Sequence, residues 1–182
     1  MYVNSFIAAI ERTKRFELTQ PILFMSPGSI LNQDHMIKIA AAIETESVQT
    51  KNKDIAQGAF VFHDRFKREI EKIIGSPTYY TLGFVKVDDK ELFKTSEDKL
   101  EQLLSDKIHF SEGVNMHAWL TLPTMEIIDL TLATTLGYQL NTPELLGLIV
   151  SGHADSQSIK YTPQIVGIEY LERIGALIAL SA

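Results

Sequence analysis

Apolar residues recur at three- and four-residue intervals over several stretches of the chain, the pattern of a helix with one buried face. Val3, Phe6, Ile7 and Ile10 share such a face and predict an amphipathic helix over residues 2–15. A later stretch ends at Gly75, a residue type that often closes helices in the left-handed conformation. Helices are predicted over residues 2–15, 32–46, 60–74 and 95–105, and Thr-Pro pairs at 142–143 and 162–163 predict two more, each with threonine as N-cap.

Strand patterns gather in the middle of the chain. Residues 79–87 are rich in aromatic and β-branched types, and in residues 114–122 two sets of side chains alternate, which predicts strands with one set facing a core. Residues 126–131 form the returning strand of a hairpin if Leu122 lies opposite Glu126. Because the helices lie toward both ends, we predict an α+β fold with a small antiparallel sheet packed on helices.

Composition and charge narrow the class of protein. A length of 182 residues fits one domain, and 45% hydrophobic with 22% charged residues is typical of a globular chain. The formal charge of −6 disfavours nucleic acid as a partner. The apolar tail from Gln164 to Leu180 is interrupted by charges and predicts a core helix, and the first residues lack the basic segment of a signal peptide. We therefore expect a cytoplasmic protein of one domain, residues 1–182, without a membrane partner.

The chain contains no cysteine, which excludes disulfides, thiolate metal sites and a thiol nucleophile. His35, His63 and His153 each have an aspartate close by in the sequence, but none belongs to a two-ligand helical repeat, so we expect no metal site. We also expect no cofactor, because no glycine-rich phosphate loop is present. Ser29 lacks the context of a nucleophile elbow, and an N-cap or turn role is expected for it. Ser76 follows a predicted helix C-terminus, where the helix dipole would oppose a forming alkoxide, so neither serine is expected to be a nucleophile.

One hairpin carries candidate chemistry. In the predicted register Thr131 lies opposite His117, and Asp129 is the diagonal neighbour of His117 on the same face. Diagonal neighbours lie about 7–8 Å apart at the backbone, so an imidazole and a carboxylate extended toward each other can meet. An aspartate in that position would orient the ring and stabilise an imidazolium, as a base that serves a nucleophile requires.

This hairpin resembles the second half of the transglutaminase-like proteins, within the papain-like group of cysteine hydrolases and acyltransferases. Members carry a His-Ala-Trp strand and then a strand ending in Asp-Pro-Thr, matched here by residues 117–119 and 129–131, with Leu130 in place of proline. The family's nucleophile lies in a Gly-x-Cys sequence at the start of a helix, and Gly58-Ala59-Phe60 falls where that sequence belongs. The resemblance implies a transglutaminase-like core over about residues 58–131, with helical additions over 1–46 and 142–182.

Phe60 stands where the family carries its cysteine, and a benzyl side chain cannot attack a carbonyl. The resemblance thus implies that His117 and Asp129 are a relic catalytic dyad. It also implies that Trp119 lines a binding cleft, together with His63 one turn into the Phe60 helix. We interpret the chain as catalytically inactive, with a binding or scaffold role and a peptide or protein as its possible ligand.

Three alternatives stay open at this point. The chain could be a hydrolase or acyltransferase in which His117 and Asp129 serve a hydroxyl or a water, and a Ser or Thr oxygen within about 3 Å of the His117 ring would favour it. It could be a structural or assembly subunit with a closed cleft and a large apolar patch. Or the hairpin could have no site at all, with Trp119 in the core and Asp129 capping a turn.

Overall fold

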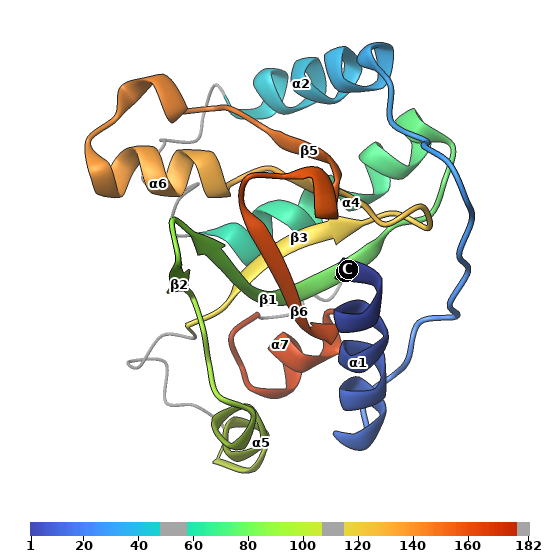
Figure 1. Cartoon of the computed structure of the whole chain (residues 1–182), viewed down its shortest axis with the longest axis vertical. Helices are drawn as coiled ribbons and strands as arrows, with labels where there is room; N and C mark the ends of the chain where they lie inside the picture. The colour runs from blue at the N-terminus through green and yellow to red at the C-terminus, as the bar shows by residue number, and fades with distance from the viewer. Residues whose placement is uncertain (48–57, 107–114, 178–182) are drawn as a thin grey trace. The chain divides into compact units, whose positions relative to one another are not determined.

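The structure is a computed structural model, which describes residues 1–47, 58–106 and 115–177 (Figure 1). The chain divides into two compact units, each assembled from separate segments. Unit 1 comprises Met1–Ile22, Thr81–His117 and Ser158–Ala182, and unit 2 comprises Leu23–Tyr80 and Ala118–Gln157. The fold is α+β, as predicted. The core expected over residues 58–131 is therefore divided between the two units.

In unit 1 the strands form an antiparallel ladder around β1, which pairs with β2 and with β6. Helix α1 packs on β6, and its face toward the interior carries the buried residues Phe6 and Ala9. The elements of this unit are α1 (Tyr2–Arg15), β1 (Tyr79–Val87, whose first two residues belong to unit 2), β2 (Lys90–Leu92), α5 (Glu97–Asp106), β6 (Lys160–Val166) and α7 (Glu169–Arg173).

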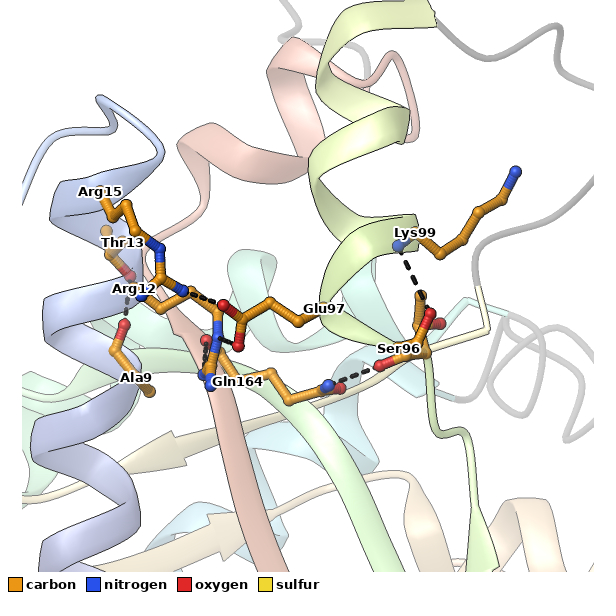
Figure 2. Close-up of polar contacts among 9 residues, drawn as sticks. Ala9, Arg12, Thr13, Arg15, Ser96, Glu97, Lys99 and Gln164 are labelled. Atoms are coloured by element: carbon orange, nitrogen blue, oxygen red, sulfur yellow. Dashed lines mark hydrogen bonds and ion pairs between the residues drawn. The ribbon is translucent and has the colours of Figure 1, made fainter.

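Polar contacts fasten α1 to the rest of unit 1 (Figure 2). The Thr13 hydroxyl donates to the carbonyl of Ala9 over 2.8 Å and accepts from the N–H of Val166 over 2.9 Å, which ties α1 to β6. Arg12 donates to the carbonyl of Gln164 over 2.9 Å and to the carboxylate of Glu97 over 2.8 Å. One residue therefore links α1 both to β6 and to the start of α5.

Unit 2 holds the predicted hairpin. Its strands pair antiparallel in the order β3–β4–β5, and α2 packs on α4. Leu120 lies opposite Ile128, and the N–H of Leu122 donates to the carbonyl of Glu126 over 2.8 Å, so the predicted register is confirmed. The elements are α2 (Gln33–Ser47), α4 (Ala59–Ile74), β3 (His117–Thr121, whose first residue belongs to unit 1), β4 (Glu126–Asp129), α6 (Leu132–Leu140), η1 (Pro143–Leu145), β5 (Val150–His153) and η2 (Ala154–Ser156).

Local capping explains why several helices begin and end where the sequence predicted. Asn32 precedes α2 and accepts the N–H of His35 over 2.9 Å. Ser96 precedes α5 and accepts the N–H of Lys99 over 3.4 Å. Gly75 closes α4 with φ of 65° and donates to the carbonyl of Glu71. The predictions for α1, α2, α4 and α5 are confirmed to within two residues at each end that the structure describes.

Both helices predicted from Thr-Pro pairs are wrong. Pro143 begins only the 3₁₀ turn η1, and Thr162-Pro163 lies inside β6. Pro163 pairs with Gly83 where the register of β1 against β6 shifts, and a proline without an N–H is tolerated at such an irregularity. Within the described part of the apolar tail, the helix is limited to α7. No helix among the described residues is long and apolar enough to cross a membrane.

Candidate functional site

The predicted site residues fall in both units. Phe60, His63, Trp119 and Asp129 belong to unit 2, whereas His117 is the last residue of the middle segment of unit 1. Within unit 1 the His117 side chain is buried, 2% exposed, and its ring stacks on that of Phe93 with centroids 5.3 Å apart. The pairing of His117 with Asp129 stays a prediction.

Asp129 ends β4 and organises the turn into α6. Its Oδ1 accepts the backbone N–H groups of Thr131 and Leu132, each over 3.0 Å. Thr131 is the N-cap residue of α6, but its own side chain makes no capping hydrogen bond. Asp129 therefore supplies the capping oxygen that Thr131 does not, and this carboxylate satisfies amide groups at a helix start where negative charge is favourable. This is the turn-capping role that the alternative interpretation of the hairpin gave to Asp129.

His63 joins helix α4 to the residue that follows β4. The N–H of Leu130 donates to Nε2 over 3.0 Å, and Nδ1 lies 2.8 Å from the carbonyl oxygen of Ala59. An amide N–H can only donate and a carbonyl can only accept, so the ring is neutral and carries its proton on Nδ1. The Asp129 Oδ1 lies 3.7 Å from Nε2, too far for a hydrogen bond. His63 thus acts as a buried polar bridge between backbone segments.

Phe60 and Trp119 differ in their access to solvent. Phe60 lies in the first turn of α4 and is half-buried, and its carbonyl accepts the hydroxyl of Tyr80 over 2.8 Å. Burial, and then the charge of Asp64, raises the pKa of Tyr80 well above its usual value, so this phenol stays protonated. Trp119 is 0% exposed within β3. Contact between Trp119 and a ligand stays a prediction, and it would require the surrounding core to open.

Glu126 is an ordered, buried carboxylate that the sequence did not single out. It is 1% exposed, and it accepts the hydroxyls of Ser29 and Thr124 at 2.5 Å each and the N–H of Ile30 at 2.7 Å. Burial raises the pKa of Glu126, but hydrogen bonds from Ser29, Thr124 and the Ile30 and Leu31 amides outweigh it and lower that pKa. The signal in the sequence was an acid that opens a short apolar strand, and in the structure all four residues of that strand are buried.

The remaining candidates have structural contacts. The Ser29 hydroxyl donates to the Glu126 carboxylate from the segment before α2, and the Ser76 hydroxyl lies 3.3 Å from the carbonyl oxygen of Pro77 in the bend after α4. Over residues 1–47, 58–106 and 115–177 no group of three or more His, Asp or Glu side chains could hold a metal ion. A cleft of about 400 Å³ lies in unit 1, and its lining contains none of the predicted site residues.

Comparison of the chain with protein-family models, with curated proteins and with solved structures finds no match. The resemblance to transglutaminase-like proteins therefore rests on the hairpin and helix motifs of the sequence alone.

Proposed function

We propose that the chain is a catalytically inactive, transglutaminase-like protein in which the residues of the family's motif serve as scaffold. The observation that carries the proposal is the His63–Leu130–Asp129 arrangement, in which both side chains form hydrogen bonds with backbone groups at the end of β4, the start of α4 and the start of α6. An Asp129 that caps α6 holds that helix in place, and a His63 that accepts Leu130 holds the end of β4 against α4. The absence of cysteine from the sequence removes the family's nucleophile.

Burial separates the scaffold role from the hydrolase alternative. A group that moves a proton during catalysis must reach the substrate directly or through one water. His63, Trp119 and Asp129 are 0% exposed in unit 2, so catalysis there would require this part of the unit to open first.

A binding role would fall on the start of α4 rather than on the buried motif. Val61 is 59% exposed, and the half-buried Phe60 precedes it. An apolar contact with a peptide or protein ligand is the interaction that this pair offers. The charged residues that follow on the helix, Asp64 and Arg65, are both exposed and would lie at the rim of such a contact.

The proposed relationship to transglutaminase-like proteins is tested by placing a thiol at position 60. Phe60→Cys introduces a single cysteine, and we expect its alkylation by iodoacetamide to have a pH midpoint about one unit below that of Val61→Cys, because a nearby imidazolium stabilises the thiolate. The Val61→Cys protein is the matched control, since it places a thiol in the same helical turn. Adding His117→Ala to Phe60→Cys should abolish the difference. Equal midpoints in the two single-cysteine proteins would contradict the proposed relationship.

The absence of catalysis is tested on the unaltered chain. We expect p-nitrophenyl acetate hydrolysis and amine incorporation into a glutamine-containing peptide to proceed at the same rate with the wild type, with His117→Ala and with Asp129→Asn. Asp129→Asn keeps an oxygen able to cap α6, so it removes the negative charge of the side chain and preserves the cap. A wild-type turnover that His117→Ala removes would establish the hydrolase or acyltransferase alternative instead.

A further inference from the structure

Strand β5 ends the β3–β4–β5 ladder of unit 2. It pairs with β4 from Glu126 opposite His153 to Asp129 opposite Val150, and within the described ranges no strand pairs with its other side. An open edge presents N–H and C=O groups to any other extended chain. Natural proteins usually protect such an edge with charges, proline, a bulge or a covering segment.

The ten residues that contain β5 have neither charge nor proline, and the nearest charges are Glu144 before them and Asp155 after them. Residues 145–154 read LLGLIVSGHA, with no Asp, Glu, Lys, Arg or Pro. Leu148, just before the strand, is 51% exposed, and Ile149 and Val150 are β-branched. A short uncharged segment of high strand propensity is the kind that pairs with copies of itself.

The hydrogen-bond phase of the ladder shows which groups of β5 turn outward. The N–H of Ala154 donates to the carbonyl of Met125 over 3.2 Å, so residues in phase with Ala154 face β4. Gly152 is in phase with Ala154. Ser151 and His153 are out of phase, and their backbone groups therefore point away from β4, along the open edge.

The Gln157 side chain covers the outward carbonyls of Ser151 and His153. Its Nε2 donates to the carbonyl of Ser151 over 3.2 Å and to the carbonyl of His153 over 3.3 Å. Gly152 lies between them with φ of +121°, and a Cβ atom there would come within 3.0 Å of the Gln157 Nε2. The glycine thus admits the amide, and one side chain bridges two successive outward carbonyls of the edge.

We propose that Gln157 is a latch that keeps β5 from pairing with β5 of a second copy of this chain. The second copy is the occupant that the edge fits, because two antiparallel copies of an uncharged segment oppose no like charges, although the chain as a whole carries −6. Ser151 and His153 offer both donors and acceptors along the edge, so a twofold arrangement lets each copy satisfy the other. Displacing the Gln157 amide exposes this self-complementary edge.

The test is the self-association of Gln157→Ala, measured by sedimentation over a concentration series. We expect a dimer dissociation constant at least tenfold lower than that of the wild type. Gln102→Ala, a matched change at an exposed position of α5, should leave self-association unchanged. Equal mass distributions for Gln157→Ala and the wild type would overturn the proposal, as would a wild type that already dimerises to the same extent.

A second measurement locates the contact. Amide hydrogen exchange at Ser151 and His153 should slow as the concentration of Gln157→Ala rises, and association without that protection would overturn the proposal. If Gln157→Ala does not fold, Gln157→Asn carries the same test. It keeps the amide but is one methylene shorter, so it cannot reach both carbonyls.

Discussion

Leu130 donates its backbone N–H to Nε2 of His63 over 3.0 Å, and both residues are buried. His63→Ala removes the acceptor of that N–H and leaves a cavity beside α4. We expect a loss of about 2–4 kcal/mol in the free energy of unfolding. Urea denaturation followed by circular dichroism measures it. His153→Ala, at an exposed position, is the control and should stay within about 0.5 kcal/mol of the wild type.

The capping role of Asp129 predicts a contrast between two substitutions. Asp129→Ala leaves the N–H groups of Thr131 and Leu132 without their acceptor, and we expect it to cost about 1–2 kcal/mol. Asp129→Asn retains a side-chain oxygen and should cost less than half as much. Thermal unfolding of the two variants provides the comparison. Equal losses would show that the charge of Asp129, rather than its capping oxygen, stabilises the turn.

Ser29, Thr124 and Ile30 donate hydrogen bonds to Glu126 and form the Glu126 clamp. This clamp predicts a specific pH dependence of stability. Because the folded-state pKa of Glu126 is lowered from 4.5, its stabilisation is present above that value and is lost as the pH falls through the lowered folded-state pKa. We expect Glu126→Gln to be about 1–3 kcal/mol less stable than the wild type at pH 7. The difference should shrink progressively below about pH 4.5.

Urea midpoints between pH 3 and 7 check this prediction. Glu101→Gln removes the same formal charge from an exposed position of α5 and should run parallel to the wild type across the range. A Glu126→Gln curve that also runs parallel would contradict the clamp.

In unit 1 the buried hydroxyl of Thr13 predicts another contrast. Thr13→Val keeps the shape of the side chain but leaves the N–H of Val166 without the acceptor shown in the structure, which we expect to cost about 1–3 kcal/mol. Thr13→Ser keeps the hydroxyl and should recover most of that stability. Hydrogen exchange at the Val166 amide should accelerate in Thr13→Val alone.

Much of the fold could be predicted because its signals are local. The face of α1 and the cap of α4 at Gly75 can be recognised from neighbouring residues, and a short turn sets the register of β3 against β4. Helix α6 was missed because it is buried almost all round from Leu132 to Gly137, so it has no polar face to mark its period. The Thr162-Pro163 pair misled because threonine and proline also suit an irregular strand.

The candidate site was harder to predict than the fold. The sequence identified Asp129 and His63, and the structure brings them within 3.7 Å of each other. It did not identify Glu126, because Ser29 and Glu126 are 97 residues apart and no local pattern connects them. Nor could residue spacing reveal that Leu130, which aligns with the family's proline if the proposed resemblance holds, would use its N–H to hold His63. The family's proline has no N–H with which to make that bond.

The contact between α1 and β6 joins residues that are 153 positions apart at Thr13 and Val166. During synthesis α1 is made long before β6, so its apolar side lacks its strand partner until all of unit 2, which ends at Gln157, has been translated. We therefore expect unit 1 to close after unit 2, because a ribosome stalled after Gln157 would hold a chain in which α1 lacks the strand it packs against.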